Sequence, residues 1–414
     1  MHPELLTFAA RLRALISVCP ALSPAVPETG ALPGGAHPKP TVPASTPLSL
    51  PAPTEASFDE LALELFTLQF HGNPAYQTLC LARGRTPGTV QEWTQIPAVP
   101  TAAFKELELS SIPATGRTTV FHSSGTTEQR PSRHFHHATS LAVYEASLTR
   151  WFAHYLGTGD TLRFLTPGRT AAPHSSLIHM FETLRQQRAL PASVFLGNLA
   201  TDGSWALDFP AVQAELASSV HTGRPVTLLG TAFSFVHLLD LLAEHQLKFR
   251  LPTGSRVMET GGYKNRSRTM PKAQLHALIT AQLGVPAGGI VCEYGMSELS
   301  SQAYGVASDE GRLASGDNAA PNPSLPPHHS SLVTGPSPLA LHFPPWARAQ
   351  VISPETCREV PEGGTGIIRV LDLANVFSVA AVQTEDLGIR RGTGFELLGR
   401  AEKAEPRGCS LMTI

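Results

Sequence analysis

The chain has 414 residues, of which 42% are hydrophobic and 15% are charged, and its formal net charge is −2. This composition permits a large buried core, and the lack of a long basic run excludes a nucleic-acid footprint and a polybasic membrane patch. The five cysteines are dispersed and form no Cys-x-x-Cys pair. That pattern is typical of reduced thiols in a cytoplasmic protein and argues against a disulfide framework or a structural zinc site.

Residues 1–57 are expected to form an N-terminal extension. A short helix is predicted over residues 1–17. The stretch 20–53 is rich in proline, which favours an extended, solvated conformation without a packed core. The most apolar stretch of the chain, 226–242, is interrupted by polar residues, so we expect no membrane-spanning helix.

The globular part is expected over residues 58–396. Apolar residues at helical spacing predict a helix from Phe58 to the Asn73-Pro74 pair and a second helix over 75–82. Further along, strands alternate with helices of about a dozen residues, which predicts α/β units with parallel strand pairing. The strands are predicted at 118–121, 162–165, 226–229, 256–259 and 290–293, and the helices at 138–155, 175–186, 233–245 and 271–283.

The C-terminal part is expected to contain more β-structure. Residues 306–345 are rich in Gly, Pro, Ser and Asn and are interpreted as a loop insertion. Asp386 is expected in a polar turn between two strands. Residues 397–414 are interpreted as a hinge-like segment and a hydrophilic tail that carries Cys409. Short strands are predicted over 349–352, 366–372 and 395–398.

The first motif with chemical potential is the loop Ser123-Ser124-Gly125-Thr126-Thr127, which follows a predicted strand. Backbone N–H groups and hydroxyls in such a loop can surround a triphosphate, and the glycine permits close approach. The loop lacks the Gly-Lys-Ser/Thr sequence of a Walker A motif. A Ser/Thr turn that caps a helix would give the same pattern.

Two further motifs also follow predicted strands. The sequence Glu-Tyr-Gly-Met-Ser-Glu at 293–298 ends in a carboxylate, which is a natural Mg²⁺ ligand beside phosphate oxygens. The sequence Glu-Thr-Gly-Gly at 259–262 lets the backbone pass close to a planar ligand. A surface turn and an ordinary strand-to-helix turn are the alternatives. Because such strand ends share one edge of an α/β sheet, we expect the three motifs to surround one cleft.

Isolated residues are weaker signals. Asp386 could hold ribose hydroxyls or only shape a turn. The thiolate of Cys409 would be a strong nucleophile, although an isolated tail cysteine is usually inert. The run His134-Phe135-His136-His137 could bind a metal, but alternate residues of a strand face opposite sides and no partner cluster is evident.

Taken in order, these motifs resemble those of the adenylate-forming superfamily and, within it, of the LuxE-type acyl-protein synthetases. The stretch 123–128 is similar to the superfamily's phosphate loop, and 293–298 to its adenine and magnesium motif. Asp386 matches its ribose aspartate, and Gly-Arg at 399–400 its hinge. The stretches that resemble the LuxE-type group more specifically are 96–105, 175–180, 259–264, 293–302 and 407–411.

The resemblance implies an adenylate-forming fold with α/β layers and a β-rich C-terminal part, in which the usual mobile C-terminal domain is absent or vestigial. ATP and Mg²⁺ would be the cofactors. Glu298 would bind Mg²⁺ and would form the catalytic set with Thr126 and the acyl acceptor Cys409. The nucleotide-binding set would be Ser123, Ser124, Gly125, Thr126, Thr127, Gly261, Gly262, Tyr294, Gly295, Ser297, Asp386 and Arg400.

The activity implied by the resemblance is ATP-dependent activation of a carboxylic acid, a fatty acid in this group, to an acyl-adenylate. Transfer to Cys409 would follow, with an acyl-accepting protein such as a fatty acyl reductase as partner. A ligase that passes the acyl group to CoA or to an amine is one alternative. Glu128 stands where the phosphate loop commonly has glycine, which keeps a non-catalytic nucleotide-binding paralogue as another.

Overall fold

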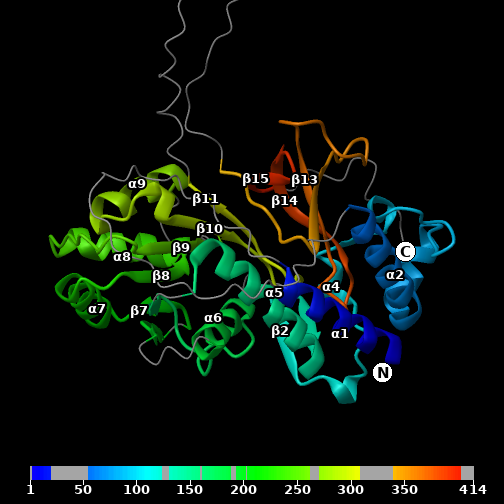
Figure 1. Cartoon of the computed structure of the whole chain (residues 1–414), viewed down its shortest axis with the longest axis horizontal. Helices are drawn as coiled ribbons and strands as arrows, with labels where there is room; N and C mark the ends of the chain where they lie inside the picture. Colours follow the sequence, from blue (N-terminus) through cyan, green and yellow to red (C-terminus); the bar gives the residue numbers. More distant parts are fainter. Residues whose placement is uncertain are drawn as a thin grey trace, which may run out of the picture.

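The computed structural model describes residues 2–19, 55–123, 130–158, 161–187, 193–201, 203–261, 270–307 and 339–401. Most of the 123–127 loop, the centre of the 306–345 insertion and the tail with Cys409 lie outside these residues. The predicted mixed α/β fold with a β-rich C-terminal part is confirmed. A mainly parallel sheet with its helices and a second, mainly antiparallel sheet lie side by side (Figure 1).

The first sheet has six described strands. They are β4 (Thr161–Phe164), β5 (Val194–Phe195), β8 (Val226–Thr231), β9 (Arg256–Thr260), β10 (Ile290–Tyr294) and β11 (Ala303–Val306). Their order is β11-β10-β9-β8-β4-β5, and all neighbours are parallel except β10 and β11. The central strands β8, β9 and β10 are buried along almost their whole length, as parallel strands covered on both faces usually are.

Helices in the connections between these strands cover the sheet. They are α6 (Ser176–Gln187), α7 (Phe209–Thr222), α8 (Ala232–Glu244) and α9 (Lys272–Leu283). The hydroxyl of Thr231 at the end of β8 accepts a hydrogen bond from the Ser234 backbone N–H, so the strand passes directly into α8. Helix α8 packs on β8 and β9 and against α9. The last turns of α7 and α9 are followed by left-handed Gly223 and Gly284, which end both helices.

The second sheet belongs to the C-terminal part. Its strands are β1 (Val99–Pro100), β12 (Ala347–Ile352), β13 (Thr365–Asp372), β14 (Ala381–Arg391) and β15 (Gly394–Arg400). Their order is β1-β14-β13-β12, and β15 pairs with β14. All pairs are antiparallel except β1 with β14.

The position of Asp386 differs from the prediction. It lies inside the long strand β14, opposite Arg400 of β15, and not in a turn. The polar residues Gln383 and Glu385 occupy exposed positions of this strand, so the sequence around Asp386 has the polarity of a turn although its backbone is extended.

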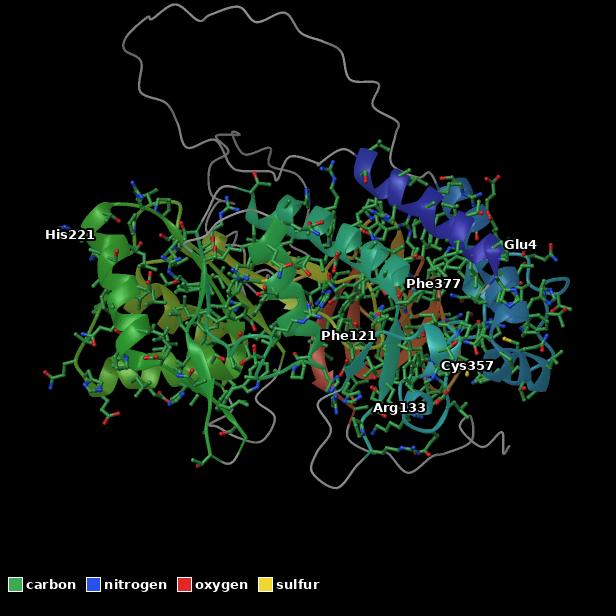
Figure 2. The ribbon with its side chains drawn as sticks, turned by 90° about the horizontal axis from the view of Figure 1, so that it is seen from below. Glu4, Phe121, Arg133, His221, Cys357 and Phe377 are labelled. Carbon is green, nitrogen blue, oxygen red and sulfur yellow. The ribbon has the colours of Figure 1, made fainter. Side chains whose placement is uncertain are left out.

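The N-terminal helices join the same core. Helix α1 (Pro3–Val18) packs against α5 (Ala138–Leu156) and α2 (Glu55–Gly72), and its apolar side chains belong to the main hydrophobic cluster. The Gln69 side chain of α2 donates to the Asn375 carbonyl at 2.7 Å and accepts from the Ala380 N–H at 2.9 Å. Figure 2 shows α1 along the surface and Phe377 in the interior. The boundary at residue 58 stays a prediction, but α1 is a packed element.

Shorter elements complete the described fold. They are α3 (Pro74–Ala82), α4 (Ala103–Glu106), β2 (Thr119–His122), β3 (Arg133–His136), β6 (Gly197–Leu199), β7 (Trp205–Leu207) and three 3₁₀ turns at Trp93–Gln95, Ala114–Gly116 and Ala287–Gly289. Strand β2 does not join the parallel sheet as the α/β pattern suggested, but pairs antiparallel with β3. The connection 123–132 is too short for a parallel crossover, so only an antiparallel pairing is available.

Among the described helices, none has the length and apolarity needed to cross a bilayer.

Candidate active site

A large cleft opens where the carboxyl ends of β8, β9 and β10 face the second sheet. Its volume is about 2160 Å³, which exceeds the roughly 300–1,000 Å³ of a typical small-molecule pocket and can hold two substrates. All predicted site residues within the described chain line it: Ser123, Gly261, Tyr294, Gly295, Ser297, Glu298, Asp386 and Arg400. The remaining predicted residues lie outside the described chain: Ser124, Gly125, Thr126, Thr127, Gly262 and Cys409.

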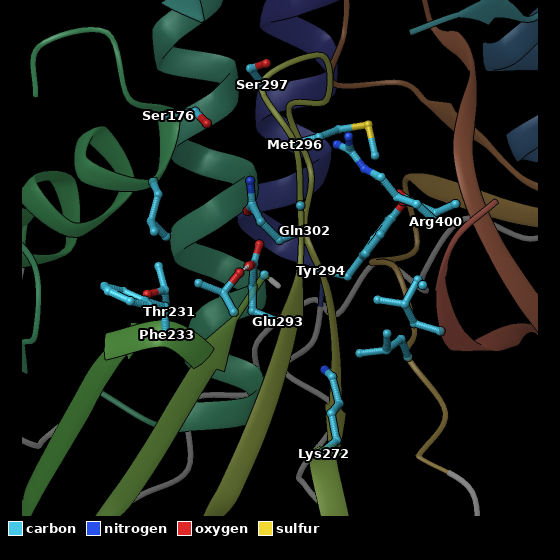
Figure 3. Close-up of a pocket in the computed structure, with 18 of the residues that line it drawn as sticks. Ser176, Thr231, Phe233, Lys272, Glu293, Tyr294, Met296, Ser297, Gln302 and Arg400 are labelled. Atoms are coloured by element: carbon cyan, nitrogen blue, oxygen red, sulfur yellow. Dashed lines mark hydrogen bonds and ion pairs between the residues drawn. The ribbon is translucent and has the colours of Figure 1, made fainter. Parts of the chain in front are cut away.

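One wall of the cleft joins the two sheets through Tyr294. Its hydroxyl, at the end of β10, donates to Oδ2 of Asp386 in β14 at 2.8 Å. Arg400 Nε lies 3.9 Å from the other carboxylate oxygen, and Figure 3 shows Arg400 beside Tyr294. Burial raises the pKa of Asp386, while the Tyr294 hydrogen bond and the Arg400 charge oppose that shift. The arrangement offers a carboxylate acceptor next to an aromatic ring, which suits a nucleoside.

A second wall centres on Glu298. The hydroxyls of Ser132 and Ser297 donate to its two carboxylate oxygens, the latter at 2.9 Å. In the described part of the chain no cationic side chain pairs with this buried carboxylate. A carboxylate with only neutral hydroxyl partners fits the donor chemistry of a Mg²⁺ ligand.

Ser132 is a site residue that the sequence did not reveal. Besides binding Glu298, its backbone N–H donates to the Ser123 hydroxyl at 3.0 Å. It therefore fixes the start of the Ser/Thr/Gly loop against the motif that follows β10. No sequence signal marks Ser132, because its role depends on the β2–β3 pairing.

A polar corner of the cleft was also missed. Glu293 is fully buried and accepts from the Thr260 hydroxyl. Burial raises the pKa of Glu293 to about 7, the negative charge of Glu259 adds to the shift, and the Thr260 hydrogen bond opposes it. Gln302 lies next to Glu293 (Figure 3), and its buried Oε1 has no hydrogen-bond partner among the described residues.

Steric constraints explain why the motifs 259–262 and 293–298 contain glycine. A Cβ at Gly295 would lie 2.4 Å from Oε1 of Glu293, so no larger residue fits without movement. Gly261 has a φ of +71°, a conformation that L side chains rarely adopt. These constraints bring the backbone close to the cleft at both strand ends.

The cleft also has an apolar side. Phe233 lines it together with Leu177, Met180 and Trp205, next to Thr231. The histidines of β3 do not form a metal site with other described residues. His134 and His136 stack with ring centroids 4.7 Å apart, and burial lowers the pKa of His134 to about 4.

No protein-family model matches the chain. Over 376 residues it is 22% identical to the long-chain-fatty-acid–luciferin-component ligase of Aliivibrio fischeri, covering 85% of this chain and 86% of that protein. The ligase of the same name from Vibrio harveyi is 31% identical over 75 residues, or 16% of this chain and 20% of that protein. The solved structure of 2-hydroxyisobutyryl-CoA ligase with 2-HIB-AMP covers 84% of this chain and 67% of its own, with a TM-score of 0.58 and 14% identity.

The structural match shows the fold: the chain has the fold of the adenylate-forming enzymes. The sequence match is narrower. The chain resembles a LuxE-type acyl-protein synthetase over most of its length, as the motifs predicted.

Proposed function

We propose that this protein activates a carboxylic acid with ATP and then carries the acyl group on its own Cys409 thiol. The observation that carries the first half is the convergence of Ser123, the 293–298 motif with Tyr294 and Glu298, and Asp386 on one cleft, although they come from three distant parts of the chain. The similarity to one long-chain-fatty-acid ligase over 85% of the chain supports the same conclusion.

In the first half-reaction the acid's carboxylate oxygen attacks the α-phosphorus of ATP, and pyrophosphate leaves. We assign the phosphates to the Ser123–Thr127 loop, with Thr126 in the catalytic set, and the adenine to Tyr294, Gly295 and the two glycines 261 and 262. The ribose hydroxyls would donate to Asp386, with Arg400 beside them. Catalysis of this kind consists mainly of positioning and charge neutralisation.

Two residues are assigned to the α-phosphate region. Glu298 would hold Mg²⁺, whose charge neutralises the phosphate oxygens. Ser297 would lie near the α-phosphate. Because Ser132 binds both Glu298 and Ser123, it positions this region relative to the phosphate loop.

In the second half-reaction the Cys409 thiolate attacks the acyl carbon. A thioester bond forms, the bond to the AMP oxygen breaks, and AMP leaves with the electron pair. The thioester would then pass to an acyl-accepting protein such as a fatty acyl reductase. The apolar side of the cleft near Phe233 suits a fatty acyl chain.

The test is a pyrophosphate-exchange screen with a panel of carboxylic acids that includes long-chain fatty acids. Glu298→Gln should lower exchange by about 10²-fold or more with the fold intact. The exposed Glu355→Gln is the matched control and should exchange normally. ATP binding without exchange for any acid would favour a non-catalytic paralogue instead.

A second experiment separates the two half-reactions. Cys409→Ser should keep exchange but lose the hydroxylamine-sensitive acyl-enzyme formed from labelled fatty acid. The structural match to a CoA ligase makes CoA the second candidate acceptor. Acyl-CoA formation by the Cys409→Ser variant at the wild-type rate would overturn the assignment of Cys409.

A further inference from the structure

Three side chains with metal-ligand atoms meet beside the cleft, on elements that are distant in sequence. They are Glu259 of β9, His276 of α9 and Cys292 of β10, and their ligand atoms all lie within 4.8 Å of one another. The parallel pairing of β9 and β10 places Cys292 directly beside Glu259 on the same face of the sheet. Helix α9, which is drawn above β9 and β10 in Figure 1, connects the two strands and carries His276.

The distances between the ligand atoms are close to those of a tetrahedral zinc site. With Zn–S of about 2.3 Å and Zn–N or Zn–O of about 2.0 Å, tetrahedral ligands lie about 3.3–3.6 Å apart. Cys292 Sγ is 3.6 Å from His276 Nε2, and His276 Nε2 is 3.4 Å from Glu259 Oε1. The third edge, from Cys292 Sγ to Glu259 Oε1, is 2.8 Å. Only this edge has to widen, by about 0.7 Å, for all three atoms to share one ion.

The two carboxylate oxygens of Glu259 differ in their number of hydrogen-bond partners, and a bound cation would even out this difference. His276, Cys292 and Lys272 all contact Oε1, the lysine Nζ at 3.0 Å. Oε2 is buried and has no hydrogen-bond partner among the described residues. Leaving a buried carboxylate oxygen unpaired is unfavourable. If a cation binds Oε1, the Lys272 ammonium can shift from Oε1 to Oε2, and Oε2 then gains a hydrogen-bond partner.

The charges are also compatible with a divalent ion. A carboxylate and a thiolate contribute two negative charges, and the Lys272 ammonium compensates only one of them. Lys272 and His276 also line the cleft, so water can reach the site from there. A thiolate, an imidazole and a carboxylate form a donor set that favours Zn²⁺ over Mg²⁺ or Ca²⁺, which require oxygen ligands.

We propose that Glu259, His276 and Cys292 bind a Zn²⁺ ion, with a water molecule from the cleft as the fourth ligand. The dispersed cysteines argued against a zinc site in the sequence. The three ligands do not form a short motif, because Glu259 and His276 are 17 residues apart and His276 and Cys292 are 16 residues apart. The ion would link α9 to the strands β9 and β10. Its ligand Glu259 lies one residue before Thr260, and its ligand Cys292 lies two residues before Tyr294; both Thr260 and Tyr294 line the cleft. It is separate from the Mg²⁺ assigned to Glu298.

The test measures metal in the full-length chain purified without chelators. We expect about one zinc per chain by elemental analysis, and loss of at least 80% of it in Cys292→Ser. Cys80→Ser, which changes a buried cysteine of α3 outside the cluster, should keep its zinc. Cobalt added to the metal-free chain should give a thiolate-to-cobalt charge-transfer band that Cys292→Ser lacks.

A second measurement does not depend on how well the variants fold. The wild-type chain should lose melting temperature when a strong chelator removes the metal, and Zn²⁺ alone should restore it. Substoichiometric zinc, together with no cobalt band, would overturn the proposal. The four side chains would then be a network of ion pairs and hydrogen bonds centred on the Glu259 carboxylate. Zinc retained in Cys292→Ser would equally overturn it, because the ion would lie elsewhere.

Discussion

The two sheets contribute to the cleft in different ways. The parallel sheet presents residues from the loops that follow β8, β9 and β10, where backbone and side chains project beyond the strand ends. The antiparallel sheet presents Asp386 from the middle of a strand and Arg400 from the end of another. The first region can therefore build its part of the site locally, whereas the second depends on strand register.

The largest effect is expected from removing the bond between the two regions. Asp386→Ala deletes the candidate ribose acceptor and the carboxylate to which the buried Tyr294 hydroxyl donates. We expect the KM for ATP in pyrophosphate exchange to rise roughly 10- to 100-fold. Tyr294→Phe removes the same hydrogen bond but keeps the carboxylate, so its effect should be smaller. An unchanged KM in Asp386→Ala would mean that Asp386 does not contact the nucleotide.

The second-largest effect is expected from a change confined to the parallel sheet. Gly295→Ala places a Cβ against the Glu293 carboxylate, so we expect a loss of about 1–3 kcal/mol in the free energy of unfolding. Gly288→Ala is the matched control, because a Cβ there meets nothing within 4 Å and its φ is not positive. Urea denaturation of both variants measures the difference. Equal stabilities would show that Glu293 moves aside at little cost.

Strand β3, which packs against β2, α4 and α5, gives a pH dependence. His136 is buried beside His134, His137 and His179. Burial, with smaller contributions from these neighbours, lowers its pKa well below 6.5, and burial lowers that of His134 to about 4. As the pH falls from 6.5 towards 4, the two histidines therefore bind protons in the unfolded chain while they stay neutral in the folded chain.

Stability should consequently decrease over that pH interval, by up to about 1.4 kcal/mol per pH unit for each histidine. Urea denaturation at pH 7, 6 and 5 measures the slope. His136→Gln should flatten it, while His221→Gln, at an exposed position of α7, should not. A slope in His136→Gln equal to that of the wild type would exclude His136 as its source.

The smallest effect is expected at Arg400. Its side chain is 79% exposed and lies 3.9 Å from Asp386, so Arg400→Ala should change the free energy of unfolding by less than about 0.5 kcal/mol. Calorimetric titration with ATP separates structure from function here. A marked loss of affinity at unchanged stability would show that Arg400 contacts the nucleotide directly.

The difference between the parallel and the antiparallel sheet also explains which parts of the structure could be predicted from the sequence. The helices and strands around β8, β9 and β10 were predicted within a few residues, because buried parallel strands and amphipathic helices have distinct periodicities. The motifs at 259–262 and 293–298 follow these strands, so their place in one cleft could be inferred from the topology rule for parallel sheets. Strand β14 was missed because the uninterrupted polar run 383–386 has the composition of a turn.

Other parts of the site could not be predicted because they depend on tertiary contacts. Ser132 acts through β2–β3 pairing and the approach of Glu298, neither of which leaves a local pattern. Glu293 is the first residue of the 293–298 motif, but its burial and its contact with Thr260 follow only from strand register. The Glu259, His276 and Cys292 cluster has no short spacing that would mark it.

Helix α1 has a practical consequence for shortened versions of the protein. Its residues Leu5, Phe8, Leu12 and Ile16 are at most 1% exposed, and they cover apolar surface on α5 and α2. Truncation at residue 55 would uncover that surface, although the removed segment consists mostly of proline-rich chain. Such a truncated protein should self-associate in light scattering, and a synthetic peptide of residues 2–19 should restore the monodisperse form.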